Sequence, residues 1–306
     1  LPPNDETGRG EGYVEFTIRP RTSVATGTVI TNDATIIFDN NEPIRTNIVS
    51  NTIDAEAPVS AALPLPAASD PGEVIVNIAA GDMPGGSGLA GSRLFVSRDG
   101  GAYQPVSSLS FDQQAAALLE SGHVYRFVTQ ATDNAGNIES LPGTPDAITT
   151  TLAIGLSPSS DTGIPGDGLT NDRTPTLAFV GPPGTTIDIR LTGPREIEAV
   201  VPCGPDGRGT FTVPDALTLP DGVYAVSITS GEVSAGATIA IDTTPPVIDR
   251  WQSIATHSEV GDATITMFSG QGIEPRGSGV ARLRYIYEGG PPDSAIPTPD
   301  RVEVTG

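Results

Sequence analysis

Apolar and polar residues alternate with a period of two along several short segments, the spacing that places one face of a β-strand against a core. The clearest segment is 123–132, HVYRFVTQAT. Val124 and Val128 fall on one face of this segment, and Tyr125 and Phe127 fall on the other. Ten residues of such alternation predict a long strand.

The rest of the chain also reads as β-structure. No segment has sustained apolar spacing of 3.6 residues, and the best helix candidate, 113–120 (QQAAALLE), spans barely two turns where a strand is expected. The Asp-Gly pair in 98–101 (RDGG) predicts a hairpin turn. Tyr125 and Tyr224 each follow a leucine and a turn, the setting in which a tyrosine hydroxyl bonds back to nearby backbone. We therefore predict an all-β fold.

Proline-rich joints divide the chain into units. They lie at 54–58 (DAEAP), 141–151 (LPGTPDAITTT) and 242–246 (DTTPP). Proline excludes helix and disfavours central strand pairing. The segments between the joints have the length of one immunoglobulin-like sandwich. The predicted units are the C-terminal half of a sandwich at 1–55, complete sandwiches at 56–151 and 152–244, and the N-terminal half of another at 245–306.

The two terminal units are predicted to be incomplete. Residues 276–288 repeat the pattern of 85–97, which places 245–306 at the start of a sandwich. Strands expected at 12–20, 27–39 and 44–53 would close another one. Two interpretations stay open: an excerpt of a longer chain, or strand donation between chains that builds a head-to-tail filament.

The charge of the chain excludes several partners. The formal net charge is −21, and all 16 basic residues are arginine. Such a chain repels nucleic acid and anionic membrane surfaces, and no apolar run long enough to insert into a membrane is present. The absence of lysine excludes Schiff-base chemistry and P-loops.

Nucleophilic catalysis has little support in the sequence. His123 and His257 are the two histidines, and Cys203 is the single cysteine. Cys203 has no evident catalytic partner, and an intrachain disulfide is excluded. Trp251 is the one tryptophan, whereas a carbohydrate-binding platform usually needs several aromatic residues. We predict that the chain is not an enzyme.

Three motifs resemble repeats of large bacterial cell-surface and secreted proteins. Residues 36–54 (IIFDNNEPIRTNIVSNTID) resemble a motif that precedes fibronectin type III-like modules, and 57–150 resemble such a module. Residues 160–175 (SDTGIPGDGLTNDRTP) and 241–247 (IDTTPPV) resemble the start and end of bacterial immunoglobulin-like repeats of adhesins. The resemblance implies a tandem array of fibronectin type III-like and immunoglobulin-like β-sandwiches at a bacterial cell surface or outside the cell.

The loop 160–175 raises the question of what its carboxylates do. A catalytic acid pair would need a cleft that nothing else in the chain supports. The adhesin resemblance implies junction calcium sites, with Asp161, Asp167 and Asp172 as ligands and Asp242 at the next joint. Solvated turn residues are the alternative, since Asp and Asn favour turns without any metal.

Two further acidic segments are candidates for calcium, which takes six to eight oxygen ligands in irregular geometry. Asp39 begins 39–43 (DNNEP), and Asp54 lies at the first joint. Asp133 begins 133–137 (DNAGN), which also fits a plain turn.

The sequence thus predicts a structural or adhesive segment of a large extracellular modular protein, a stalk or spacer stiffened by Ca²⁺ at its joints. Its partners would be neighbouring domains of the same or adjacent chains. Two alternatives stay open: a self-assembling filament or surface-layer subunit, and a non-catalytic accessory region of a secreted hydrolase.

Overall fold

The computed structural model describes residues 6–7, 13, 15–21, 23–38, 40–106 and 111–244, together with the backbone of four later strands. Nearly all regular structure in these residues is β-strand, which confirms the all-β prediction. The exception is one turn of 3₁₀-helix, η1 (Asp215–Leu217). No described helix has the length and apolarity needed to cross a membrane.

The first sandwich consists of two sheets with the strand orders β10-β7-β5 and β6-β12-β11-β8-β9. All pairs are antiparallel except β6 with β12. The strands are β5 (Val59–Ala62), β6 (Ala68–Ser69), β7 (Gly72–Gly81), β8 (Leu89–Arg98), β9 (Gln104–Pro105), β10 (Gln114–Leu119), β11 (Val124–Asp133) and β12 (Ala147–Thr151).

Period-two patterning explains the core of this sandwich. In β10, Ala115, Ala117 and Leu119 point inward while their neighbours are exposed, so the weak helix candidate is a strand. Phe127 of β11 and Leu94 of β8 are fully buried in the same core. Each buried side chain of this size contributes roughly 1.5–3 kcal/mol relative to exposure.

The second sandwich repeats this topology, with strand orders β13-β15-β18 and β14-β20-β19-β16-β17. Its short strand β14 pairs in parallel with the last strand β20, as β6 does with β12. The strands are β13 (Ala153–Leu156), β14 (Leu169–Thr170), β15 (Thr176–Val180), β16 (Thr186–Thr192), β17 (Ile197–Pro202), β18 (Arg208–Thr212), β19 (Gly222–Ser230) and β20 (Val233–Ile241).

Both predicted tyrosine corners are present. The hydroxyl of Tyr125 accepts a hydrogen bond from the amide of Glu120 at 2.7 Å. The hydroxyl of Tyr224 donates to the carbonyl of Pro220 at 2.9 Å. Both rings are buried, so each turn is tied to the core of its own sandwich.

The N-terminal segment forms narrow two-stranded ribbons. Strand β1 (Val29–Asn32) pairs with β4 (Val49–Thr52), and β2 (Thr35–Ile36) pairs with β3 (Ile44–Arg45). Residues 15–20 form no strand, so the strand expected at 12–20 is wrong for them. Their alternating pattern does not suffice, because a strand also needs a hydrogen-bonded neighbour.

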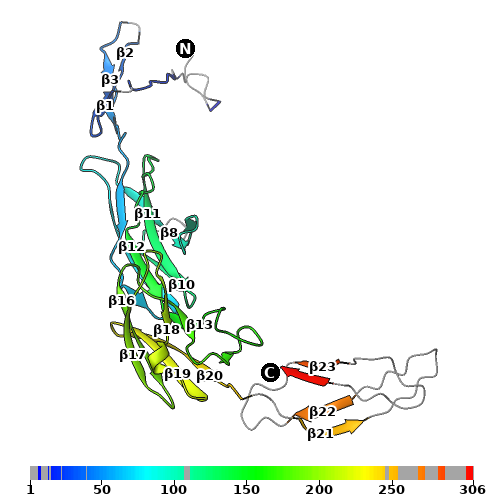
Figure 1. Cartoon of the computed structure of the whole chain (residues 1–306). Helices are drawn as coiled ribbons and strands as arrows, with labels where there is room; N and C mark the ends of the chain where they lie inside the picture. The colour runs from blue at the N-terminus through cyan, green and yellow to red at the C-terminus, as the bar shows by residue number, and fades with distance from the viewer. Residues whose placement is uncertain are drawn as a thin grey trace, which may run out of the picture.

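Beyond residue 244 the structure gives two antiparallel strand pairs. They are β21 (Ile248–Ser253) with β22 (Phe268–Gly272), and β23 (Arg282–Ile286) with β24 (Arg301–Thr305). The predicted half-sandwich at 245–306 and its repeat of 85–97 lie largely outside the described residues, as do His257 and the side chain of Trp251. Figure 1 shows the β1–β4 ribbon, the first sandwich and the second sandwich following one another from top to bottom.

Candidate metal centre at the first joint

Three carboxylates from separate parts of the chain meet between the N-terminal ribbon and the first sandwich. Asp54 follows β4, Asp82 follows β7, and Asp133 ends β11. One oxygen of each lies within 4.8 Å of the other two. Sequence reasoning proposed Asp54 and Asp133 as ligands, and the structure brings these two together.

The loop after β7 fixes the position of Asp82. Its Oδ1 accepts the amide of Met83 at 2.8 Å, and its Oδ2 accepts the amide of Gly88 at 2.6 Å. A Cβ at Gly86 would lie 2.5 Å from Oδ2 of Asp82. A side chain at position 86 would therefore displace this carboxylate.

Asp54 connects the ribbon to the sandwich. Its Oδ2 accepts the amide of Ser87 at 2.7 Å, and its carbonyl accepts the side-chain amide of Asn137 at 3.3 Å. Hydrogen bonds from Ser87 are the main cause that lowers the pKa of Asp54 below the usual 3.8. The ionised form is thus favoured at neutral pH.

Asp133 is the most buried of the three, with 2 % of its surface exposed. Its Oδ1 accepts the amide of Asn137 at 2.8 Å, and its Oδ2 accepts the Asn137 side chain at 2.7 Å. The turn predicted at 133–137 is therefore formed by the carboxylate itself. Neither hydrogen bond supplies a positive charge to balance Asp133.

The electrostatics of the cluster favour a cation. Among the described residues, no arginine or histidine forms an ion pair with any of the three carboxylates. Like charges at this separation repel one another. Carboxylate and carbonyl oxygens are the ligands that Ca²⁺ prefers, and Ca²⁺ tolerates irregular geometry. The donor set fits that ion.

The other predicted loop is organised differently. Oδ2 of Asp161 accepts the amide of Gly166, and Oδ1 of Asp167 accepts the amide of Leu169. Oδ1 of Asp172 accepts the amide of Thr174, and its Oδ2 accepts a hydroxyl. These bonds are the turn chemistry weighed as the alternative. Asp161 retains one buried oxygen with no hydrogen-bond partner, and a metal role for this loop stays a prediction.

Asp242, another predicted ligand, lies away from the cluster. Oδ1 of Asp242 accepts the amide of Thr244 at 3.0 Å, near the end of the second sandwich. The acidic centre of that end is Asp221, which accepts bonds from Thr243 and pairs with Arg173 at 2.8 Å. Asp39 lies outside the described residues.

Sequence reasoning missed Asp82. The signal was available in 81–86 (GDMPGG), where an acidic residue directly follows a strand in a glycine-rich loop. Pairing it with Asp133 required knowing that the ends of β7 and β11 lie at the same end of the sandwich.

The nucleophile candidates sit in structural positions. Cys203 is buried, and burial raises the pKa of its thiol, which disfavours the reactive thiolate. The Nδ1 of His123 lies 2.7 Å from Oδ2 of Asp99, at the opposite end of the sandwich from the acidic cluster.

Solved structures that resemble this chain include tandem-repeat proteins, and their overall similarity to it is low. A tetra-tandem repeat from the extending region of a large adhesion protein is 16 % identical over 71 % of this chain and 57 % of that one, with a TM-score of 0.24. The central fibronectin-III array of RIM-binding protein is 15 % identical over 66 % of this chain and 76 % of that one, with a TM-score of 0.23. A Ca²⁺-stabilized adhesin that helps an Antarctic bacterium bind ice is 14 % identical over 76 % of this chain and 61 % of that one, with a TM-score of 0.20. TM-scores this low do not establish a common arrangement of domains.

Family models match two parts of the sequence. Residues 1–52 match a domain of unknown function, DUF7619, and residues 148–250 match the bacterial Ig-like domain. No curated protein matches the chain. The second match includes all of β13–β20. It confirms the expectation that the chain contains a bacterial immunoglobulin-like repeat.

Proposed function

We propose that this chain is a non-enzymatic structural segment of an extracellular, adhesin-type bacterial protein, and that Ca²⁺ stiffens its first joint. The observation that carries the proposal is the convergence of Asp54, Asp82 and Asp133 from three segments onto one joint. The bacterial Ig-like domain and the repeated sandwich topology support the structural role.

The residues of the joint explain how a cation would act. Asp54 belongs to the connection, whereas Asp82 and Asp133 belong to the rigid sandwich. Without a cation, their mutual repulsion favours separation of the connection from the sandwich. A bound Ca²⁺ would neutralise the three charges and hold the connection against the loops. Binding is then coupled to order at the joint.

The first test is a thermal melt of the 306-residue chain after chelation, with and without Ca²⁺ at fixed ionic strength. We expect Ca²⁺ to raise the melting temperature by several degrees and to saturate, because a ligand that binds only the ordered state stabilises it by mass action. Mg²⁺ should do less, since it demands near-ideal octahedral geometry. An unchanged melt would overturn the calcium claim.

Two matched pairs of substitutions locate the site. Asp82→Asn with Asp133→Asn should abolish the calcium response, because each substitution removes a negative charge and one of the two acceptor oxygens of the side chain. Asp161→Asn with Asp167→Asn should leave the response in place, because these carboxylates cap turns in another loop. The reverse result would assign the calcium site to the loop of the second sandwich.

A second candidate function, head-to-tail assembly, is favoured by apolar side chains that the N-terminal segment leaves exposed. Phe16, Ile18, Ile37 and Ile48 are all more than half exposed. A neighbouring molecule that supplied strands would cover such residues. Size-exclusion chromatography tests this candidate: ordered polymers support assembly, whereas a monomer at all concentrations contradicts it.

A further inference from the structure

The connection between the two sandwiches is a single residue. Strand β12 ends at Thr151 and β13 begins at Ala153, so Leu152 alone separates the domains. The Leu152 side chain is 1 % exposed and packs in the core of the second sandwich, together with Ala68 from the first. The two domains therefore share part of one core.

Two glycines let the domains approach closely. A Cβ at Gly207, in the turn before β18, would lie 2.6 Å from Cγ2 of Val124 in β11. A Cβ at Gly122 would lie 3.0 Å from Cβ of Ala153. Val124 is completely buried yet does not belong to the core of its own sandwich. The loop of the second domain that carries Gly207 contacts it.

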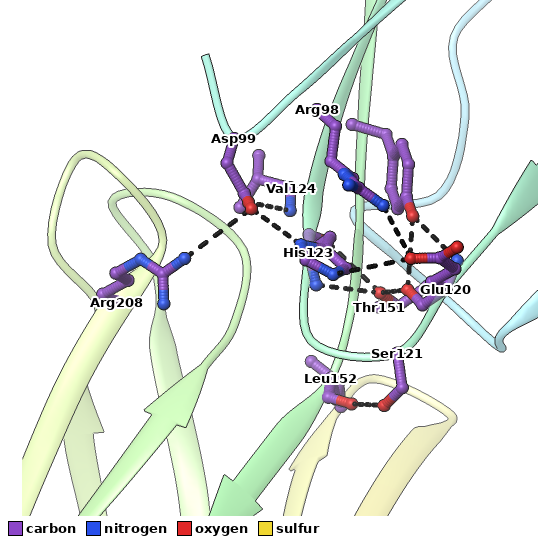
Figure 2. Close-up of polar contacts among 10 residues, drawn as sticks. Arg98, Asp99, Glu120, Ser121, His123, Val124, Thr151, Leu152 and Arg208 are labelled. Atoms are coloured by element: carbon purple, nitrogen blue, oxygen red, sulfur yellow. Dashed lines mark hydrogen bonds and ion pairs between the residues drawn. The ribbon is translucent and has the colours of Figure 1, made fainter. Parts of the chain in front are cut away.

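Polar contacts surround this packing, as Figure 2 shows. Asp99 accepts the Val124 amide at 3.0 Å, and its Oδ2 lies 2.7 Å from Nδ1 of His123. The same oxygen lies 3.7 Å from Nη2 of Arg208 in the second domain. On the connection itself, the Ser121 hydroxyl donates to the Leu152 carbonyl at 3.1 Å.

Magnitudes decide which contact dominates. Burial of a leucine or valine side chain is a substantial stabilising contribution. The Arg208 side chain is 57 % exposed, and an exposed ion pair contributes much less. Packing of Leu152 and Val124 therefore holds the joint, and the Asp99–Arg208 pair orients it.

We infer that residues 57–244 form one rigid two-domain unit whose joint is closed by Leu152 and by Val124 against Gly207, independently of any cation. The inference rests on contacts at the second joint alone, so it stands whether or not Ca²⁺ binds at the first.

The second sandwich provides an internal comparison for Val124. Val223 precedes Tyr224 in β19 as Val124 precedes Tyr125 in β11. Val223 is 62 % exposed, whereas Val124 is 0 % exposed. The same place in the same topology is buried in one sandwich by the neighbouring domain and open in the other. Val223 is thus the matched control position.

Distance measurements between spin labels on the full chain test the inference. In a Cys203→Ala background, labels at Asn77→Cys and Asp188→Cys report on the second joint, and labels at Asn51→Cys and Asn77→Cys report on the first. All three label positions are exposed. We expect a narrow distance distribution across the second joint that chelation leaves unchanged.

Substitutions then test whether the packing of Val124 causes the narrow distance distribution. Val124→Gln should broaden the distribution of label distances across the second joint, whereas Val223→Gln should leave that distribution narrow. Circular dichroism should show both variants folded, since neither side chain belongs to the core of its own sandwich. A broad distribution in the unsubstituted chain, broadening on chelation, or a Val124→Gln variant as narrow as the parent would each overturn the inference. The first-joint labels report separately on calcium.

Discussion

Different interactions hold the two joints of this chain. At the first joint three carboxylates meet, and the connection is held by hydrogen bonds from Ser87 and Asn137. At the second joint a single leucine enters the neighbouring core, and glycines allow close contact. Apolar packing acts in any ionic condition, whereas a cluster of like charges needs a counter-ion. Under the two proposals, the first joint would depend on Ca²⁺ and the second would hold without it.

The largest expected effect comes from removing the leucine that connects the sandwiches. Leu152→Ala should destabilise the second sandwich by about 2–5 kcal/mol, because it leaves a cavity in a shared core. Hydrogen exchange of the β13 and β20 amides measures the change. Leu118→Ala is the control, since Leu118 is exposed on β10; its effect should stay within about 0.5 kcal/mol. Equal effects of the two substitutions would show that Leu152 does not stabilise the joint.

An intermediate effect is expected from the glycine that contacts Val124. Gly207 has a positive φ of 80°, and Gly207→Ala should cost about 1–3 kcal/mol more than a substitution that meets only this backbone penalty, through overpacking against Cγ2 of Val124 and the carbonyl of Gly181. Gly231→Ala is the matched control, because Gly231 also has a positive φ of 63° but no atom within 4 Å of its Cβ position. Its cost should be the left-handed backbone term alone, roughly 1–2 kcal/mol. Chemical denaturation compares the two, and the comparison fails if Gly231→Ala is the more damaging.

The smallest effect is expected from pH. At the second joint, burial raises the pKa of Asp99, but the Val124 amide and His123 outweigh it, so the pKa lies below 3.8. The pKa of Asp54 at the first joint is also lowered. A folded-state pKa below the unfolded value gives stability that is present above the unfolded pKa and is lost as pH falls through the folded one.

The stabilisation that the Asp54 and Asp99 carboxylates contribute should therefore be constant from neutral pH to about pH 5 and be lost below about pH 4. The calcium increment should disappear over the same range, since protons and Ca²⁺ compete for the same oxygens. Melting temperatures recorded against pH, with and without Ca²⁺, measure both effects. A decline that begins well above pH 5 without Ca²⁺ would contradict the assignment to these carboxylates.

Much of the fold could be predicted from particular segments. Alternation in 123–132 anticipated β11, the Asp-Gly pair at 99–100 anticipated the turn after β8, and two tyrosines anticipated two corners. These features depend on residues close in sequence, where side-chain period and backbone preference act directly. The strand expected at 12–20 failed for residues 15–20, because pairing depends on a distant partner.

The candidate site could be predicted only in part from the sequence. Asp54 and Asp133 lay in acidic, turn-forming segments that the sequence marks clearly. Asp161, Asp167 and Asp172 were marked just as clearly, yet the structure shows their carboxylates bonded within their own loop. Local composition does not distinguish a carboxylate that caps a turn from one that faces two others.

The sequence by itself determined the all-β class and the acidic, lysine-free composition, because period, turn residues and charge are local or additive properties. The predicted joint at 141–151 was wrong, because its last five residues form β12 of the first sandwich and the connection is Leu152. Only the tertiary structure decided that Asp82 joins Asp54 and Asp133, and that Val124 is covered while Val223 is open. These outcomes depend on which strand ends and loops meet across the sandwich and across the joint. Long-range packing determines these contacts, and the sequence of a single segment does not specify them.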